Sequence, residues 1–320
     1  MYSVSEWWMW IGFGCFVLVM LVVDLVLFGG RRKREVGVRE ALSWVVVWVS
    51  LALFFNFLLW WYLRQTLGVE LAWEKGLEFF TGYLIEESLS VDNLFVFILI
   101  FNFFAIPPAF QKRVLSLGMF GAVVLRLGMI LLGIWLVSRF HWILYLFGLF
   151  LLFTGLRMLF SGDKEPQLAQ NKLLKWLRRR LRITPELHAQ RFFIKKAGLF
   201  YATPLFLVLV LIELSDLIFA LDSIPAIFAI TTDPFIVFTS NIFAIMGLRA
   251  MYFLLANLVE RFTLLKYGLA VILVLIGAKM LVAYWVIIPA GITLVTVASI
   301  LILCGILSWS KGAKKRVYRS

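Results

Sequence analysis

The chain has 320 residues, of which 63% are hydrophobic and 15% charged, and its formal net charge is +13. A mean hydropathy of +0.97 excludes a soluble globular domain, which has no means of burying so much apolar surface. The basic residues lie mainly in short connections between apolar runs, where the positive-inside rule accounts for them, so we expect no nucleic-acid partner.

Apolar runs of about 20 residues recur along the whole length, which is the pattern of transmembrane helices. The weakly alternating segments of an outer-membrane barrel are not what the sequence shows. We therefore predict an all-α polytopic membrane protein with about nine spans, at residues 7–28, 41–64, 78–104, 113–137, 141–160, 199–230, 235–258, 266–286 and 289–309.

The connections between these spans alternate in charge. Those rich in Lys and Arg are 29–40, 105–112, 161–198 and 259–265, together with the tail 310–320. Little positive charge is found in 65–77, 138–140, 231–234 and 287–288. This alternation predicts a multi-pass protein of the bacterial inner membrane, with its N-terminus outside and its C-terminus in the cytoplasm.

The first span is predicted to stay in the protein. Only Glu6 is charged in the preceding MYSVSEWW, and the basic RRKR follows the span, which is the reverse of a cleavable signal peptide. Cys15 in this span and Cys304 in the last one each lie alone, so no disulfide or thiolate site is predicted. His141 and His188 also lack helical partners, and we expect neither to be a metal ligand.

The third span contains the first group of intramembrane acids, in LIEESLSVDNLFVFILIF at 84–101. Glu86, Ser90 and Asn93 share one helical face, while Glu87 lies about 100° from Glu86. Asp92 lies six residues beyond Glu86, about 240° around the helix. Such acids are costly in a membrane, about 2.5–3.5 kcal/mol each on insertion scales, and are expected to face a protein interior.

A basic segment, NKLLKWLRRRLRI at 171–183, follows in the long cytoplasmic connection. Its leucines share a helical face and its basic residues surround the rest. We predict an interfacial helix lying on anionic lipid head groups, with a solvated basic loop as the alternative.

The sixth span carries the second group of acids, in LIELSDLIFALDSIPAIF at 211–228. Glu213, Asp216 and Ser223 share a stripe, and Asp222 points elsewhere on a regular helix. Pro225 removes a backbone donor, so we expect an unwound turn that brings Asp222 inward. Asn241, in the next span, is a weaker candidate ligand.

Two parts of the chain resemble each other. The segment 138–159 aligns without a gap with 260–281, LRLGM (125–129) aligns with LRAM (248–251), and EESLSVDN (86–93) aligns with DLIFALDS (216–223). Each copy holds three spans, which is an odd number, so the second copy is predicted to be inverted in the membrane, as in many secondary transporters. Chance similarity between apolar helices is the alternative.

The repeat divides the chain into five parts. We expect peripheral helices in 1–76, a first three-helix unit in 77–160, a cytoplasmic loop in 161–198, a second unit in 199–286, and a last helix with a basic tail in 287–320.

The donors of the two acidic groups are carboxylate, amide and hydroxyl oxygens, which suit Mn²⁺, Mg²⁺ or Ca²⁺ better than zinc or copper. Six carboxylates outnumber the two buried arginines, Arg126 and Arg249, so the balance favours a cation over an anion. The arginines are predicted counter-charges. A purely structural ion-pair role for these groups remains open.

Four segments, LIEESLSVDNLFVF, IELSDLIFALDSIPAIFAIT, TSNIFAIMGLRAMYFLL and ERFTLLKYGLAVIL, resemble the TerC family of integral membrane proteins, in particular its Alx branch. The resemblance extends from about residue 10 to 310. It implies metal-ion homeostasis, with manganese efflux the most favoured role, and a superfamily of exporters built from three-helix repeats. The residues carried over from its motifs as metal ligands are Glu86, Asp92, Asn93, Glu213, Asp216 and Asp222, with Glu87, Ser90, Ser223 and Asn241 as secondary candidates.

These observations predict a secondary transporter that exports Mn²⁺, with Ca²⁺ and Mg²⁺ as other possible substrates. Export is expected either in exchange for protons carried by the carboxylates or down the metal's own gradient. No Walker-type GxxxxGK[ST] sequence is present, and no organic cofactor or enzymatic activity is expected. The alternatives are a metal-delivery or scaffold protein without flux of its own, and a transporter of cationic amino acids. An acid-dyad hydrolase is disfavoured because the acids are spread over two repeats.

Overall fold

The structure is a computed structural model. It describes residues 4–28, 37–140, 142–160, 182–184, 186–188, 191–196, 199–256, 265–283, 285–286, 288 and 289–317. Within these ranges, side chains are not described at residues 24–28, 92, 265–266 and 309–317.

The described residues form nine helices and one short hairpin, which confirms the all-α membrane fold. The helices are α1 (Trp7–Phe28), α2 (Val38–Thr66), α3 (Val69–Phe103), α4 (Pro108–Arg139), α5 (Ile143–Phe160), α7 (Pro204–Phe228), α8 (Pro234–Ala256), α9 (Leu265–Val282) and α10 (Ala290–Val317). Each overlaps one predicted span. By length and composition α2, α4, α5, α7, α8 and α10 can cross a membrane, and shorter apolar stretches lie in α1 and α9.

Local sequence explains where several helices begin. Pro108, Pro204 and Pro234 open α4, α7 and α8, where a missing backbone N–H costs nothing because the first turn leaves its donors unpaired. Gly68 separates α2 from α3 with a φ of +97°, a conformation that glycine adopts readily.

Several predicted boundaries are wrong. Helix α4 begins at Pro108 and not at 113, and α10 continues to Val317 beyond the predicted 309. Helix α3 begins at Val69, so most of the predicted 65–77 connection is helical, because its polar residues interrupt the apolar pattern and not the helix. Residues 199–202 are not helical but form β2 (Leu199–Ala202), which pairs antiparallel with β1 (Phe193–Lys196) before Pro204 starts α7. Helix α9 ends at Val282, four residues before the predicted 286.

The predicted interfacial helix at 171–183 lies outside the described residues, except for Arg182 and Ile183. These two are not helical, and Ile183 forms a parallel bridge with Ala202 of β2.

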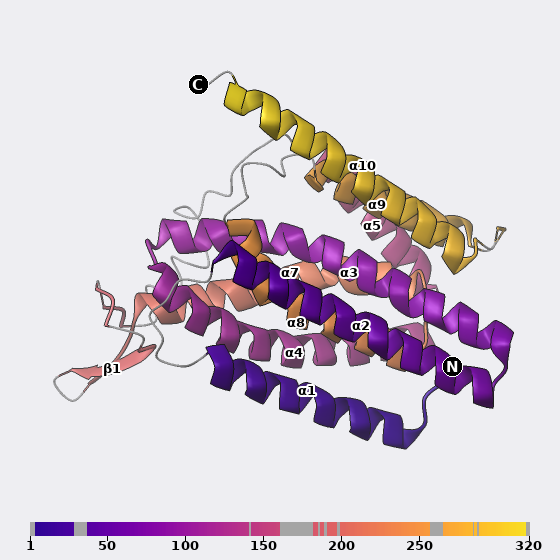
Figure 1. The fold of residues 1–320 in the computed structure, drawn as a ribbon, viewed down its shortest axis with the longest axis horizontal. Helices are drawn as coiled ribbons and strands as arrows, with labels where there is room; N and C mark the ends of the chain where they lie inside the picture. Colours follow the sequence, from indigo (N-terminus) through magenta and orange to yellow (C-terminus); the bar gives the residue numbers. More distant parts are fainter. Residues whose placement is uncertain are drawn as a thin grey trace.

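Three pairs of helices make many of the contacts within the bundle. Helix α3 packs on α8, α4 on α7, and α5 on α9, while α2 lies against α3 and α8, and α10 against α9 and α3. Figure 1 shows α5, α9 and α10 grouped on one side and α1 at the opposite edge, with the chain ends at opposite ends of the bundle. Helix α8 is the centre of this arrangement, since 94% of the residues in its 18-residue apolar stretch are buried.

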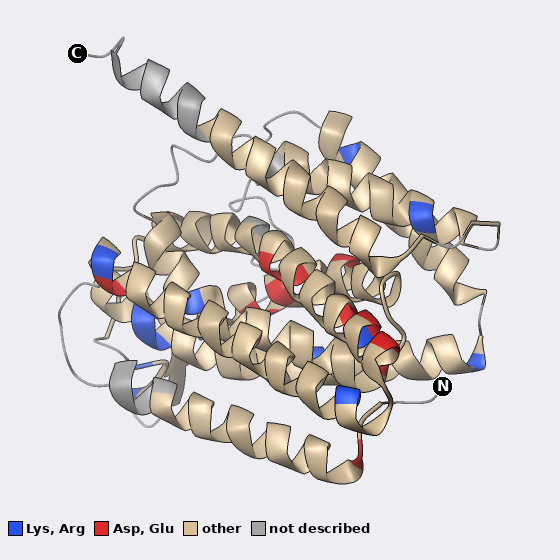
Figure 2. Cartoon of the chain, turned by 45° about the vertical axis from the view of Figure 1, so that its right-hand side comes forward, with Lys and Arg blue, Asp and Glu red and all other residues tan. Residues whose placement is uncertain are grey.

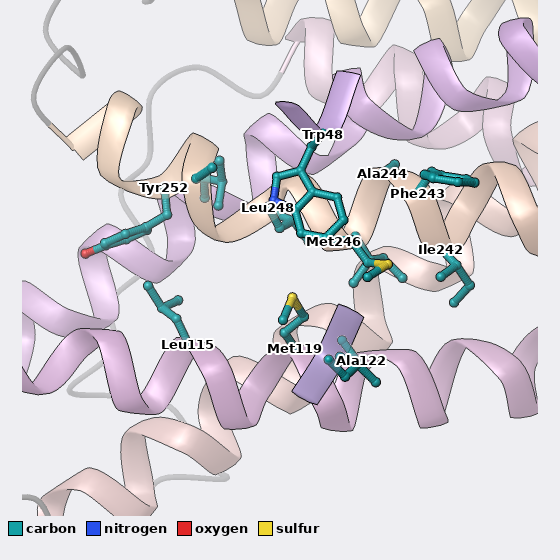
Figure 3. Close-up of a cluster of buried hydrophobic side chains, with 14 of the residues drawn as sticks. Trp48, Leu115, Met119, Ala122, Ile242, Phe243, Ala244, Met246, Leu248 and Tyr252 are labelled. Carbon is teal, nitrogen blue, oxygen red and sulfur yellow. The ribbon is translucent and has the colours of Figure 1, made fainter. Parts of the chain in front are cut away.

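The largest buried cluster surrounds α8. Met246 and Leu248 of α8 face Met119 and Ala122 of α4, and Trp48 of α2 covers them from the other side (Figure 3). This packing holds α2, α4 and α8 together at the level of the acidic groups.

Helices α5 and α9 approach unusually closely. A Cβ added at Gly148 would lie 3.1 Å from the carbonyl oxygen of Gly277, and one added at Gly155 would lie 2.7 Å from that of Ala270. Small residues at a helix interface permit such backbone contact in membranes. The pair therefore forms a tight unit beside the rest of the bundle.

Candidate functional site

The candidate site is built around Arg126 of α4, whose side chain is fully buried. Its Nη2 donates to Asp216 Oδ1 at 3.2 Å and its Nε to Asp216 Oδ2 at 3.4 Å, so the guanidinium holds this carboxylate with two bonds. Its Nη1 forms a salt bridge with Glu86. The same nitrogen donates to Ser223 Oγ at 2.8 Å and to Asn241 Oδ1 at 3.3 Å.

Two amides complete the cluster. Asn241 Nδ2 donates to Glu86 Oε2 at 3.2 Å, and Asn93 Nδ2 donates to Asp216 Oδ1 at 3.4 Å. We call these six residues the Arg126 cluster; they are Glu86, Asn93, Arg126, Asp216, Ser223 and Asn241. Each is at most 2% exposed, and they come from α3, α4, α7 and α8.

Helix periodicity explains how α3 and α7 contribute. Asn93 lies seven residues after Glu86, and Ser223 lies seven residues after Asp216. Seven residues are close to two helical turns, so each helix presents an acid and a neutral oxygen-bearing side chain on one face. The two faces meet across Arg126, as the predicted stripes require.

The charges of the cluster do not balance. Two carboxylates surround one guanidinium, which leaves a net charge of −1 when both acids are ionised. Ionised groups inside a membrane protein need such pairing because water is absent. Figure 2 shows that acidic residues lie on helices within the bundle, while several basic residues mark its ends.

Glu213 lies outside the Arg126 cluster. Its carboxylate fills the space against Gly121 of α4, where an added Cβ would clash with it, and its Oε2 is buried without a hydrogen-bond partner. Glu213, Asp216 and Arg249 line a small cavity of about 30 Å³. Since a water needs about 10–15 Å³, the cavity has room for water beside the cluster.

Arg249 of α8 lines the same cavity as Glu213. Its Nη1 donates to Ser116 Oγ of α4 at 3.1 Å, and the residue is 5% exposed. Arg126 thus contacts Glu86 and Asp216 directly, and Arg249 donates to a hydroxyl of α4.

The Glu87 carboxylate faces α8 and α2, whereas that of Glu86 faces Arg126 of α4. A Cβ added at Gly247 of α8 would lie 3.5 Å from Glu87 Oε1 and 3.8 Å from Trp48 Cβ. Its Oε2 is buried without a hydrogen-bond partner. Glu87 therefore sits between α3, α8 and α2, away from Arg126.

The remaining candidates are placed as follows. Ser90 is buried on α3 and its Oγ has no hydrogen-bond partner, and Asp222 is partly buried on α7. Asp92 lies within α3, but its side chain is outside the described part. The expected unwound turn at Pro225 is wrong, because α7 continues through it to Phe228, and packing around this last turn keeps it helical.

Among the described side chains, no group of three or more His, Cys, Asp or Glu residues is close enough to hold a metal ion. Glu86 and Asp216 instead share Arg126. Within the described part of the chain, two of the five predicted ligand acids, Glu86 and Asp216, therefore meet at Arg126, and Glu213 lies beside Asp216 at the small cavity.

Sequence reasoning missed a second polar group near the start of α3. Lys75 Nζ lies 2.8 Å from Glu78 Oε2, and Glu78 is 6% exposed. Lys279 of α9 donates to Thr293 Oγ1 of α10 at 3.0 Å. The signal in the sequence was the Lys75 and Glu78 spacing of three residues, which places both on one helix face.

A family model described as "Integral membrane protein TerC family" matches residues 71–317. A "Putative membrane-bound redox modulator Alx" from Photorhabdus laumondii is 53% identical over 301 residues, covering 94% of each chain. The protein of the same name from Escherichia coli (strain K12) is 53% identical over 300 residues, again with 94% of each chain.

A more distant relative is an "Uncharacterized membrane protein STKORF319" of Myxococcus xanthus, 47% identical over 299 residues, which are 93% of this chain and 91% of that one. No solved structure matches.

Proposed function

This chain belongs to the TerC family of integral membrane proteins, and we propose that it is a secondary transporter that exports a divalent metal cation, Mn²⁺ in the first place, through the Arg126 cluster. The observation that carries the proposal is that two buried carboxylates on α3 and α7 share one guanidinium. Such a site has excess negative charge, and a metal ion can take the place of the Arg126 guanidinium beside the two carboxylates.

The donor set supports a hard divalent cation. Glu86 and Asp216 supply carboxylate oxygens, Asn93 and Asn241 amide oxygens, and Ser223 a hydroxyl, all at the level of Arg126. Asn93 Oδ1 is buried and has no hydrogen-bond partner, so an oxygen acceptor is available there. Oxygen ligands of this kind suit Mn²⁺, Mg²⁺ and Ca²⁺.

Arg126 gives the site two charge states. In the cation-free form the guanidinium pairs with Glu86 and Asp216 and keeps both carboxylates tolerable inside the membrane. When a metal ion enters, it competes with Arg126 for these acids, and the guanidinium moves aside. Return of Arg126 to the acids would favour release of the metal. The site would then bind the metal with different affinity in its two states, as a transport cycle requires.

The helix packing supports an inverted repeat. In the predicted repeat, α3, α4 and α5 are equivalent to α7, α8 and α9. A symmetric arrangement then requires that a contact between α3 and α8 be matched by one between α7 and α4, and that α5 contact its own equivalent α9. All three contacts are present. In the alignment of 138–159 with 260–281, Gly148 is equivalent to Ala270 and Gly155 to Gly277. The close contact of Gly148 with Gly277 therefore has a counterpart in that of Ala270 with Gly155, and both are present. Glu86 and Asp216, the equivalent acids, meet at the interface between the units, where transporter sites of this architecture lie.

The test is metal flux in proteoliposomes at defined Mn²⁺ gradients. Asp216→Asn and Glu86→Gln are expected to reduce Mn²⁺ flux at least about tenfold, because each removes a ligand charge. Glu70→Gln, a change of the same chemistry at an exposed position at the start of α3, is the matched control and should transport like wild type. Wild-type protein that moves no divalent cation under any gradient would overturn the proposal.

A second candidate is a membrane protein that delivers metal to extracytoplasmic enzymes, or scaffolds them, without flux of its own. It is favoured by one observation: the described acids are bridged by arginine and not gathered into a three-ligand site. The relatives' name assigns those proteins a redox role, and metal supply to redox enzymes would connect the two. This candidate predicts Mn²⁺ binding to purified protein with no transport in the same proteoliposomes.

A further inference from the structure

An apolar groove of about 470 Å³ lies between α1 and α2. Met9, Gly12 and Phe16 of α1 form one wall and Phe54 and Leu58 of α2 the other, while α8 supplies its floor through Phe235 and Phe243. The volume falls within the about 300–1,000 Å³ typical of ligand pockets. None of the residues that line the groove belongs to the Arg126 cluster.

Helix α1 contacts both α2 and the floor through aromatic rings, and the groove opens beside these contacts. Phe13 of α1 lies 5.4 Å from Phe55 of α2, measured between ring centroids, and both residues line the groove. Phe13 of α1 contacts Phe235, Phe238 and Phe243 of α8, with ring centroids 5.7–6.2 Å apart. Gly12, one residue earlier, faces the groove, and a Cβ added there would meet nothing within 4 Å. Phe54 and Leu58 are 58% and 42% exposed, so the apolar walls face the membrane.

One end of the groove carries a carboxylate. Glu6 accepts hydrogen bonds from Trp8 Nε1 at 2.9 Å and from Tyr62 Oη at 3.3 Å, and so links the start of α1 to the end of α2. The Trp8 and Tyr62 rings meet edge to face at 5.4 Å, and both residues line the groove. Trp and Tyr concentrate at the level of lipid head groups, which places this end of the groove at the membrane surface.

We propose that the groove binds one acyl chain of a phospholipid whose ammonium-bearing head group, such as ethanolamine, lies beside Glu6. Hydrocarbon is the medium that surrounds these helices, and an open apolar groove at membrane depth is filled by it. The exposed carboxylate at the mouth attracts an ammonium group and repels the phosphate of an anionic lipid that carries no amine. The acyl chain would then seal α1 against α2.

The experiment combines photo-crosslinking with native mass spectrometry on the full-length protein in detergent. The probes are phosphatidylethanolamine and phosphatidylglycerol with the same chains, and a phosphatidylethanolamine with a diazirine on one acyl chain. Gly12→Trp fills the groove. Gly14→Trp is the matched control, because Gly14 is on the same helix, does not line the groove, and also has open space around an added Cβ.

The expected adducts map to 8–16 and 51–62. Gly12→Trp should reduce adducts and retained lipid about tenfold or more, a loss of about 1.4 kcal/mol of binding, while Gly14→Trp retains both. Phosphatidylethanolamine should be retained in preference to phosphatidylglycerol, and Glu6→Gln should abolish this preference and leave the acyl-chain adducts in place.

Three outcomes would overturn the proposal. The first is adducts spread evenly over the outer faces of the bundle in wild type. The second is equal labelling of Gly12→Trp and wild type. The third is recovery of an isoprenoid quinone in place of phospholipid from the groove. The wild-type adduct map is decisive even if Gly12→Trp fails to fold.

Discussion

Asp216 is held by Arg126 through two hydrogen bonds, from Nη2 at 3.2 Å and from Nε at 3.4 Å, and both side chains are buried. The same guanidinium forms a salt bridge with Glu86, the residue that the predicted internal repeat pairs with Asp216. One arginine therefore joins the equivalent acids of two predicted repeat units. The consequences for stability and for metal binding can be separated by experiment.

Arg126→Met is expected to destabilise the protein in the absence of metal. It leaves Glu86 and Asp216 buried without their cation, and breaking a buried pair from one side typically costs about 3–5 kcal/mol. The measurement is thermal unfolding of the purified protein in detergent. Arg157→Met, at an exposed position of α5, is the matched control and should unfold close to the wild-type temperature.

The same variant distinguishes a cation site from a structural ion pair. If Mn²⁺ and Arg126 compete for the same acids, Mn²⁺ should raise the unfolding temperature of Arg126→Met more than that of wild type, because ligand binding stabilises the folded state by mass action. Equal shifts in the two proteins would show that the metal binds elsewhere, and no shift in either would contradict the metal site.

Gly277→Ala is predicted to separate α5 from α9. The added Cβ would lie 2.6 Å from the backbone nitrogen of Leu152 and 2.7 Å from the carbonyl oxygen of Gly148, and backbone atoms cannot rotate away as a side chain can. Overpacking of this kind typically costs about 1–3 kcal/mol. Thermal unfolding is the measurement, and Gly305→Ala, whose Cβ meets nothing within 4 Å, is the control. A Gly277→Ala protein as stable as this control would contradict the close contact.

The hydrophobic pattern predicted the helices well and their ends less well. Every predicted span overlaps a helix, because runs of apolar residues long enough to cross a bilayer have few other outcomes. Polar residues at the start of α3 hid its first turns, and the apolar residues 199–202 were assigned to a helix although they form a strand. Hydrophobicity alone does not separate a short strand from a helix end.

The sequence predicted which residues of the candidate site share a helical face, and it did not predict the contacts between helices. Helix periodicity correctly placed Glu86 with Asn93 and Asp216 with Ser223 on inward faces. It could not show that Asn241 binds both Glu86 and Arg126, since this depends on how α8 crosses α3 and α4. Periodicity also grouped Glu213 with Asp216, and both line the same small cavity. It could not show that the Glu213 carboxylate lies against Gly121 of α4 and has no contact with Arg126 among the hydrogen bonds of the cluster.

Asp233→Ala is expected to weaken the start of α8 and release the segment before α1. Asp233 Oδ1 accepts from the N–H groups of Phe235 at 2.9 Å and Ile236 at 3.3 Å, and its Oδ2 accepts from the N–H of Val4 at 2.7 Å. Loss of such a helix cap costs about 0.5–2 kcal/mol. Thermal unfolding and proteolysis near Val4 provide the measurement. Asp233→Asn, which keeps an acceptor, should retain more stability than Asp233→Ala, and the reverse order would contradict the capping role.

Glu213 and Glu87 have equivalent chemistry but different surroundings, and this gives the sharpest test of the site's extent. Each carboxylate has a buried oxygen without a hydrogen-bond partner, so Glu213→Gln and Glu87→Gln should both be neutral or slightly stabilising in thermal unfolding. Only Glu213 shares a cavity with Asp216 and Arg249, whereas Glu87 faces Gly247 and Trp48. Glu213→Gln is therefore expected to reduce Mn²⁺ flux at least about tenfold, as loss of a site charge does, and Glu87→Gln to leave it unchanged. If Glu87→Gln loses flux to the same extent as Asp216→Asn, the cation pathway extends between α2 and α8, and the site would have to include Glu87.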